Sequence, residues 1–398
     1  MNTEEVYVEK SSVRRLFLPA LVLANISAFL ILPLFNLNLL DIAKTFYVTV
    51  GTAGQAIAIG RIVGLVVGLA LGILSVRFKH KPLYFLGIAL VALGYAGMYL
   101  SNDFASFVFF NCIQGAGVPM IVIISVMLVG NFVLKEKRGR AVGFLTSALY
   151  LALFFGFPIT GFIAGAVGWK SVIILWMIPF VLSSFVLGFF GLRSTAFQQP
   201  IAHKSYAGAF KQVFSNKSAV ACILAAMCAF ISAQINVYTP TFLRVNFNVP
   251  LAILGVITFV GSALTASGAI IGGYLAKPSR RRILISVASF LAGLGTMSFL
   301  FMPTLLLNLS VGLPVGLVEG MAGAALLALA LEQVPGARGT MMSLNNSLGI
   351  VLGAVLGTVI GGSVLNLTGN NYQILGVTLG AFAVAEALIV FFLTREPS

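Results

Sequence analysis

Residues 72–81 read GILSVRFKHK and residues 272–282 read GGYLAKPSRRR, while residues 138–147 read RGRAVGFLTS and residues 338–347 read RGTMMSLNNS. In each pair the second segment follows the first by about 200 residues. Glycines after the second pair, Gly161 and Gly361, also correspond. The repeat predicts two structurally related halves.

The composition around these segments excludes a soluble fold. Of the 398 residues, 59% are hydrophobic and 9% charged, whereas a soluble domain carries roughly 25% charged residues. A membrane-spanning helix needs about 20 predominantly apolar residues. Runs of this kind, all free of charge, are residues 16–40, 82–102, 104–134, 141–169, 171–192, 218–243 and 245–276.

The remaining spans require cuts in longer apolar stretches. Residues 49–76 provide a second helix that contains one charge. Residues 283–331 are too long for one span and break near Pro303, and residues 339–394 break at the polar turn 366–371. The sequence therefore predicts an all-α integral membrane protein of twelve transmembrane helices.

The placement of the 24 Lys and Arg residues predicts the topology. With a cytoplasmic N-terminus, all but Lys44, Lys170, Arg244 and Arg61 fall before the first helix, in cytoplasmic loops or after the last helix. Positively charged loops resist translocation. We expect a multi-pass protein of the cell membrane with both termini in the cytoplasm, and we attribute the basic net charge to topology and not to nucleic-acid binding.

The repeat and the topology together define the domain organisation. Because each half has six helices, it begins and ends on the cytoplasmic side. The halves are therefore parallel repeats. We expect two pseudo-symmetric six-helix bundles, residues 1–192 and 218–398, joined by a basic cytoplasmic linker at 193–217.

The loop after the second helix and its copy resemble a motif of the major facilitator superfamily, GxLxDRxGRK. The first copy keeps Gly72 and Arg77, with Val76 in place of the Asp, and the second keeps Gly273 and Arg281, with Lys277 in that place. The resemblance covers essentially the whole chain and includes the drug:proton antiporter type of twelve-helix member. It implies that these loops, with Arg138 and Arg338 of the second repeated segment, act in conformational change.

Two further segments resemble motifs of the same family. In the fourth helix Gln114, Gly115 and Gly117 match RxxQGxG, with Asn111 in place of the Arg. The fifth helix carries GFPITG, with Gly156, Pro158 and Gly161, which is similar to the antiporter signature GPxxGG. The resemblance implies alternating access and a solute site near the membrane midplane between the halves.

Three ionisable residues lie inside predicted spans, where a central charge costs roughly 2.5 to 3.5 kcal/mol. Glu319 shares a helical face with Gly312, Gly316 and Gly323, so this face is expected to meet protein or a cavity. We predict that Glu319 carries a proton, with a hydrogen-bonded structural Glu as the alternative. Glu386 has large apolar neighbours at helical spacing, which favours a structural role.

Arg61 follows Gly60, the first of four glycines at a spacing of four residues that permits close helix packing. The four are Gly60, Gly64, Gly68 and Gly72. A buried Arg keeps its proton and needs an acceptor. The candidates are a carboxylate or phosphate of the substrate, a carbonyl at a helix C-terminus, or Glu319. A substrate contact and a structural clamp are both open for Arg61.

Uncharged polar residues in the predicted spans are further candidates for the solute site, although such residues also hydrogen-bond helices to one another. The resemblance implies that the first, fourth and seventh helices face the cavity. The candidates are Asn25, Asn36, Gln114, Tyr150, Gln234 and Tyr238. Gly353 and Gly357 in the eleventh helix are expected to serve helix packing or hinge motion, as are Gly156, Pro158 and Gly161.

The sequence favours secondary transport over other activities. It has two His, three Cys without metal-ligand spacing, and no GxxxxGK[ST] loop, so we expect no enzyme activity, metal or cofactor. We expect a monomer in membrane lipid that moves a small-molecule substrate with protons. The open alternatives are carriage of a small organic anion, efflux of a lipophilic compound, and a lipid-moving or sensor protein. A helical channel is disfavoured, because the sequence contains no recognisable filter or charged ring. Uptake and efflux, and symport, antiport and uniport, all fit the sequence.

Overall fold

The computed structural model describes residues 16–133, 135–192, 206–277 and 280–396, with the backbone alone at residues 72–77, 131, 135–136, 139, 206–207 and 209. The described residues form helices and no strand. Twelve helical segments among them are long and apolar enough to cross a membrane. The predicted fold class and number of spans are confirmed.

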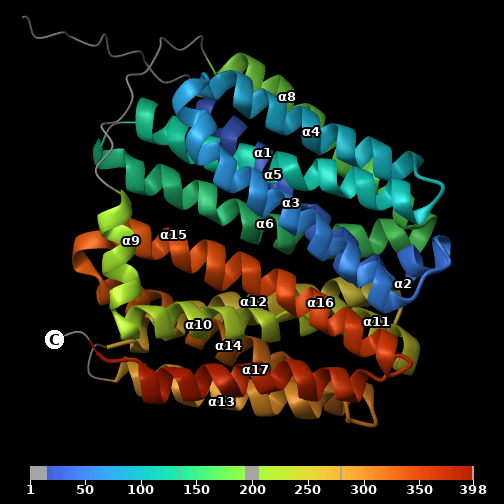
Figure 1. The fold of residues 1–398 in the computed structure, drawn as a ribbon. Coiled ribbons are helices and arrows are strands. Elements are labelled where there is room, and N and C mark those ends of the chain that lie inside the picture. The colour runs from blue at the N-terminus through green and yellow to red at the C-terminus, as the bar shows by residue number, and fades with distance from the viewer. Residues whose placement is uncertain (1–15, 134, 193–205, 278–279, 397–398) are drawn as a thin grey trace, which may run out of the picture.

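The first six spans form the N-half, the upper layer of Figure 1. Its first span is broken at Leu30, and its sixth contains a π-helical stretch. The helices are α1 (Phe17–Phe29), α2 (Ile31–Thr45), α3 (Val50–Arg77), α4 (His80–Leu100), α5 (Phe104–Phe132), α6 (Lys135–Val167), α7 (Trp169–Val172), η1 (Ile173–Met177) and α8 (Ile178–Gly191).

The last six spans form the C-half, the lower layer of Figure 1. Its first span is broken near Gln234, and its fifth contains a π-helical stretch. The helices are α10 (Lys217–Ser232), α11 (Ile235–Phe247), α12 (Leu251–Leu275), α13 (Arg281–Phe299), α14 (Leu305–Gln333), η2 (Pro335–Ala337), α15 (Arg338–Leu344), η3 (Asn345–Val351), α16 (Leu352–Leu367) and α17 (Tyr372–Leu393).

The segment predicted as a linker contains a short helix, α9 (Tyr206–Ser215). It packs against α10, α15 and η2, at the end of the bundle where the C-terminus also lies (Figure 1). We call this the linker end of the bundle and the opposite end the far end. Residues 193–205 lie outside the described residues.

Polar side chains cap three helices that begin at the far end. The side chains of Asp103, Thr304 and Asn371 accept hydrogen bonds from the backbone N–H groups at the starts of α5, α14 and α17. The turn before Asn371 uses left-handed backbone at Gly369 and Asn370, with φ of 65° and 66°. The predicted breaks near Pro303 and at 366–371 are therefore confirmed, and each has a local chemical cause.

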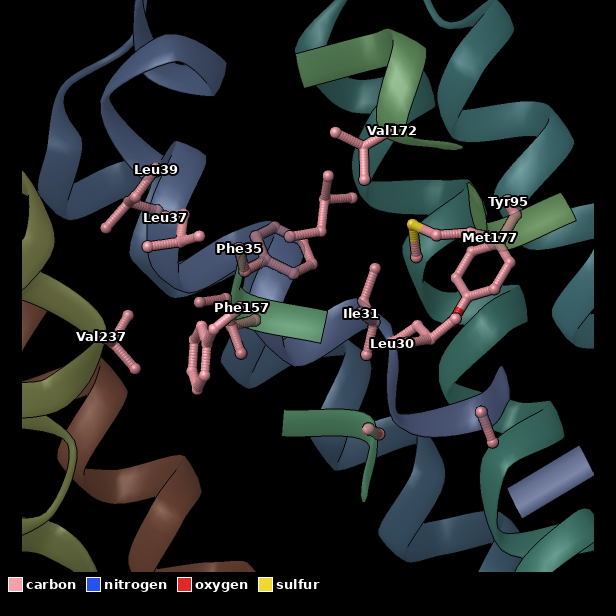
Figure 2. Close-up of a cluster of buried hydrophobic side chains, with 14 of the residues drawn as sticks. Leu30, Ile31, Phe35, Leu37, Leu39, Tyr95, Phe157, Val172, Met177 and Val237 are labelled. Carbon is pink, nitrogen blue, oxygen red and sulfur yellow. The ribbon is translucent and has the colours of Figure 1, made fainter. Parts of the chain in front are cut away.

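Buried apolar side chains fill the N-half around the break of the first span (Figure 2). Leu30, Ile31 and Phe35 lie between α6 and η1, which contribute Phe157 and Met177. Tyr95 donates a hydrogen bond to the backbone oxygen of Ser27, at 2.7 Å. This bond satisfies a carbonyl near the break, since no water is available in a bilayer core to do so.

The two halves meet closely at the far end. Helix α3 packs against α16, α6 against α12, and α2 against α11. A Cβ atom on Gly255 of α12 would lie 2.6 Å from the backbone oxygen of Phe157, and one on Gly161 of α6 would lie 2.5 Å from that of Leu251. These positions have no room for a side chain, so the two backbones are in direct contact.

Glycines nearer the linker end have open space around them. A Cβ atom on Gly143 of α6 or on Gly339 of α15 would meet nothing within 4 Å. Within the described part of the chain, close backbone contact between the halves is thus seen at far-end glycines and not at these two. The arrangement is that of two bundles held together at the far end.

Substitution of Gly255 by Val is expected to push the far ends apart. Overpacking of a close contact costs about 1–3 kcal/mol, which is enough to shift a two-state equilibrium. Spin labels at the exposed positions Ala166 and Ala252 should report a longer mean distance in the variant. Gly143→Val is the matched control, and equal distances in Gly255→Val and the parent protein would contradict the expectation.

Candidate functional site

Arg61 is held at the seam between the halves by acceptors from the C-half. Its Nη1 donates to the side-chain oxygen of Gln234 at 2.7 Å and to the backbone oxygen of Ala354 at 3.3 Å. The side chain is partly exposed. Neither protein partner predicted for Arg61 is its partner here: the carbonyl belongs to Ala354, near the start of α16 and not at a helix C-terminus, and the side-chain acceptor is Gln234 and not Glu319.

The acceptors lie at or near irregular backbone in the C-half. Gln234 stands where α10 ends and α11 begins, and its amide nitrogen also donates to the backbone oxygen of Phe230. Ala354 follows the π-helical stretch η3, and its carbonyl also accepts from the Thr358 hydroxyl. Helix breaks and π-helical turns often accompany functional sites, because they free or redirect backbone groups.

The positive charge of Arg61 is not neutralised by an ion pair in the described structure. The ion pairs among the described residues join Arg244 to Asp41 and Arg281 to Glu332. The contacts of Arg61 are neutral amide and carbonyl oxygens. A guanidinium keeps its charge in any protein environment, so the seam carries an uncompensated cation.

A row of polar contacts continues from Arg61 along the seam toward the far end. Tyr238 donates to the backbone oxygen of Thr358 at 2.8 Å and packs against Gly54. Gln55 donates to Ser363 at 3.2 Å, and Thr49 donates to Asn366 at 2.5 Å. The predicted residues Arg61, Gln234 and Tyr238 therefore come together in one region.

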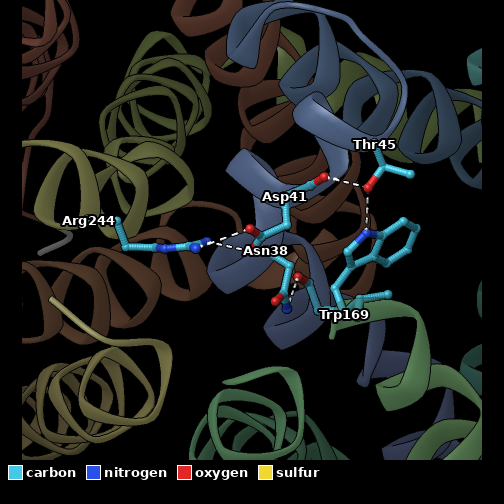
Figure 3. A network of polar contacts seen from close by, with 6 residues as sticks. Asn38, Asp41, Thr45, Trp169 and Arg244 are labelled. Carbon is cyan, nitrogen blue, oxygen red and sulfur yellow. Dashed lines mark hydrogen bonds and ion pairs between the residues drawn. The ribbon is translucent and has the colours of Figure 1, made fainter. Parts of the chain in front are cut away.

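Charged groups link the two halves at the far end itself (Figure 3). Arg244 of α11 forms a two-pronged ion pair with Asp41 of α2, in which Nη2 lies 3.1 Å from Oδ1. Both line a cavity of about 980 Å³ that also includes Lys44 and Trp169. Sequence analysis did not identify this pair, since its members are 203 residues apart.

Glu319 lies within the C-half and is partly exposed. Glycines of its predicted face contact neighbouring helices: Gly312 approaches Phe299 of α13, and Gly316 approaches Thr265 of α12. Its helix, α14, packs against α10, α12 and α13. The structure thus places Glu319 among protein side chains and away from the acceptors that hold Arg61.

The other predicted solute contacts lie in different surroundings. Asn25 bonds Ser125 at 3.0 Å and Gln114 bonds the backbone oxygen of Ala28, both in the buried interior of the N-half. Asn36 is partly buried. Tyr150 is 59% exposed and lies one helical turn from Phe154, which contacts Phe259 of α12 across the seam. Tyr150 therefore shares the seam-facing side of α6, whereas Asn25 and Gln114 bond N-half helices together.

Two arginines of the repeated loops have partners in the described structure, Arg281 and Arg138. Arg281 is buried at the start of α13 and pairs with Glu332 at the end of α14, at 2.9 Å. Arg138 donates to the backbone oxygen of Val133, and Arg338 begins α15. Gly273 has open space around it. The side chains of residues 72–77, including Arg77, lie outside the described part.

The glycines predicted for packing or hinge motion lie at close helix contacts. Gly156 approaches Pro33 of α2, beside Pro158 in α6, and Gly161 approaches α12. Gly353 and Gly357 approach the backbone of α10, where Cβ atoms would lie 2.7 Å from Met227 O and 2.6 Å from Ile231 O. Sequence analysis missed the π-helical stretch beside them, which the paired asparagines Asn345 and Asn346 begin.

Known proteins similar to this chain include named drug transporters. Multidrug resistance protein MdtM of Escherichia coli O157:H7 is 26% identical over 211 residues, which is 51% of this chain and 50% of that protein. Multidrug transporter AQR1 of Candida glabrata is 28% identical over 101 residues, 25% of this chain and 17% of that protein. The matches thus span half or less of these relatives.

Solved structures share the fold at low sequence identity. A bacterial homologue of the human lysosomal transporter Spinster, inward-facing and unoccupied, superposes with a TM-score of 0.76 at 15% identity, covering 97% of this chain and 98% of that one. A D-xylose–proton symporter gives a TM-score of 0.76 at 14% identity, with 97% and 99% covered.

The sequence profile of the Major Facilitator Superfamily matches residues 19–358, most of the span in which the repeat, the twelve helices and the seam are found. The chain belongs to the major facilitator superfamily of membrane transporters.

Proposed function

We propose that this protein is a proton-coupled secondary transporter of a small organic solute that carries a negatively charged group, and that it works by alternating access. The observation that carries the proposal is the uncompensated charge of Arg61, partly exposed at the seam and bonded to neutral oxygens from the opposite half. A carboxylate or phosphate is a stronger partner for a guanidinium than either of these oxygens.

The polar surroundings of Arg61 support exchange of one partner for another. Gln234 sits at a helix break, where its side chain can move without disturbing an intact helix. An anionic group that displaces the Gln234 oxygen would gain two parallel hydrogen bonds from the guanidinium. Because Gln234 belongs to the C-half, this displacement would also change the contact between the halves.

The contacts between the halves support an alternating-access cycle. Far-end glycines and the Asp41–Arg244 pair join the two halves at one end, while Gly143 and Gly339 near the linker end have open space around them. The similar Spinster homologue is described as inward-facing and unoccupied. In an alternating-access cycle a solute bound at Arg61 would reach the linker side while the far-end contacts are made, and the far side after they separate.

We further propose that Glu319 carries the coupled proton. It is a carboxyl group in a membrane-spanning helix, with glycines of its face in contact with two neighbouring helices. A carboxyl group in such surroundings can take up a proton at one side and release it when its exposure to water changes.

A second candidate substrate class is a lipophilic compound expelled from the cell. The seam-facing side of α6 carries Tyr150 and Phe154, and Phe154 packs on Phe259 with ring centres 4.5 Å apart. Two similar proteins are named multidrug transporters. Aromatic faces attract flat or cationic drugs, so the response to lipophilic cations separates this candidate from anion carriage.

Glu319→Gln should abolish substrate-dependent proton movement, because an amide cannot bind and release a proton. The measurement uses purified protein in liposomes with an internal pH dye, tested against organic anions and lipophilic cations. Asp103→Asn is the matched control, since Asp103 is an exposed helix cap and Asn also caps helices. Unchanged proton movement in Glu319→Gln would assign Glu319 a structural role.

Arg61→Ala should weaken transport of the anionic solute that responds in that panel. Loss of a charge-assisted hydrogen bond costs about 1.5–3 kcal/mol, which raises the half-saturating concentration about 10- to 150-fold. Arg61→Lys should recover part of the affinity, since the charge remains but the fork geometry is lost. If only lipophilic cations move, and Arg61→Ala leaves them unaffected, the efflux candidate replaces anion carriage.

We propose that the linker end faces the cytoplasm of a cell-membrane protein. In a variant without its native Cys, Lys44→Cys at the far end should react with a membrane-impermeant maleimide in intact cells. Lys79→Cys at the linker end should react only after permeabilisation, because cytoplasmic loops collect Lys and Arg. The reverse pattern would invert the topology.

A further inference from the structure

A cavity of about 980 Å³ lies at the far end, where helices of both halves meet. The N-half contributes the end of α2, the end of α6 and the start of α7, and the C-half contributes the end of α11 and the start of α12. Pockets for small molecules commonly measure about 300–1,000 Å³, so this cavity has room for an organic solute. Its lining includes Asp41, Lys44, Phe162, Trp169, Arg244 and Leu251.

The cavity is separate from the polar region around Arg61. Neither Arg61 nor its acceptors line it, whereas Gly165, near the end of α6, does. Gly161 stands one turn deeper on the same helix, where a Cβ atom would lie 2.5 Å from the backbone oxygen of Leu251. This backbone contact of α6 with α12 lies between the cavity and the deeper part of the seam. A solute in the cavity is thus outside the far-end contact.

The ion pair between the halves stands on the wall of this cavity (Figure 3). Both carboxylate oxygens of Asp41 accept hydrogen bonds from the guanidinium of Arg244. The side chains of Arg244 and Asp41 are 19% and 24% exposed. Partly exposed ion pairs contribute little net stability, because water can solvate either group. A carboxylate from solution can therefore replace Asp41 on Arg244 at small cost.

Lys44 offers the displaced carboxylate a new partner. It follows Asp41 by three residues on α2, so the two side chains stand about one helical turn apart. Lys44 is exposed, and the ion pairs of the described residues do not include it. The charged lining residues are Asp41, Lys44 and Arg244, which give the cavity a net charge of +1. A monoanion neutralises this charge, and its binding to Arg244 would leave Asp41 to pair with Lys44.

Another part of the cavity wall is apolar. Phe162 of α6 is 71% exposed, and Leu251 begins α12. The indole N–H of Trp169 donates to the Thr45 hydroxyl at 2.9 Å, so the one polar group of this ring is already bonded (Figure 3). The wall therefore favours a ligand with an apolar or aromatic body, while the guanidinium favours a carboxylate at its end.

We propose that the far-end cavity is an outer binding site for organic monocarboxylates with an apolar body, in which the carboxylate of the solute replaces Asp41 on Arg244. The inference rests on the proposed anion carriage and adds a second site to that of Arg61. Because Asp41 belongs to the N-half and Arg244 to the C-half, the exchange removes the ion pair between the halves. Gln234, the acceptor of Arg61, stands at the other end of α11, about 15 Å from Arg244 along the helix. The solute thus loosens the far-end contact one helix length from the site it reaches next.

Trp169 can report binding in its own cavity. The chain has two Trp residues, so Trp176→Phe leaves Trp169 as the single tryptophan fluorophore. This variant, as the full chain in lipid nanodiscs, is titrated with 4-iodobenzoate, whose iodine quenches tryptophan fluorescence at contact. We expect saturable quenching. The neutral 4-iodobenzamide has a similar shape and should quench weakly and without saturation, because Trp169 is 6% exposed.

Two substitutions that both break the ion pair should have opposite effects in this single-Trp background. Arg244→Gln removes the cation and should raise the half-saturating concentration of 4-iodobenzoate about tenfold or more. Asp41→Asn removes the competing carboxylate and should lower that concentration about tenfold. Asp103→Asn is the matched control and should change nothing, since Asp103 is exposed and does not line the cavity.

Opposite shifts cannot arise from a general loosening of the far end, which would move both variants the same way. Shifts in the same direction, no shift in either variant, or equal quenching by the carboxylate and the amide would overturn the proposal. The titration needs no transport. Its failure can therefore be told apart from a failure of anion carriage, which is read as solute movement in liposomes and its dependence on Arg61.

Discussion

The far-end contact between the halves is the constraint on which the rest of the structure depends. A bilayer offers no hydrophobic drive for helices to associate, so contact relies on van der Waals packing and hydrogen bonds. Gly161 and Gly255 let the backbones of α6 and α12 touch, and Asp41 and Arg244 add an ion pair beside them. Arg61 extends the contact toward the middle of the bundle through Gln234.

The ionisable residues inside the membrane-spanning helices lie in two regions, the seam between the halves and the interior of the C-half. Arg61 lies at the seam and its contacts must change whenever the halves separate. Glu319 and Glu386 lie on α14 and α17 of the C-half, and both helices pack against α13. Among the described residues neither Glu319 nor Glu386 forms an ion pair with Arg61. Any coupling between Arg61 and these acids therefore requires a conformational change of the C-half.

Sequence reasoning found the elements whose cause is local. Apolar length predicts the spans, and Pro303 and the turn at 366–371 mark helix ends that caps then fix. It could not find partners that depend on the third dimension. Gln234 is 173 residues from Arg61, and Arg244 is 203 residues from Asp41. The burial of Glu386 was likewise hidden, because apolar neighbours at helical spacing describe a lipid-facing helix and a protein interior equally well.

The symmetry of the broken helices explains why Gln234, and not a residue of an intact helix, holds Arg61. The first span of each half is interrupted, at Leu30 in the N-half and near Gln234 in the C-half. In the N-half, large apolar side chains and the Tyr95–Ser27 bond fill the break. In the C-half the break instead presents an amide to the seam. One repeat thus fills the interruption with apolar side chains, while the other places there an amide that bonds both Arg61 and the backbone of Phe230.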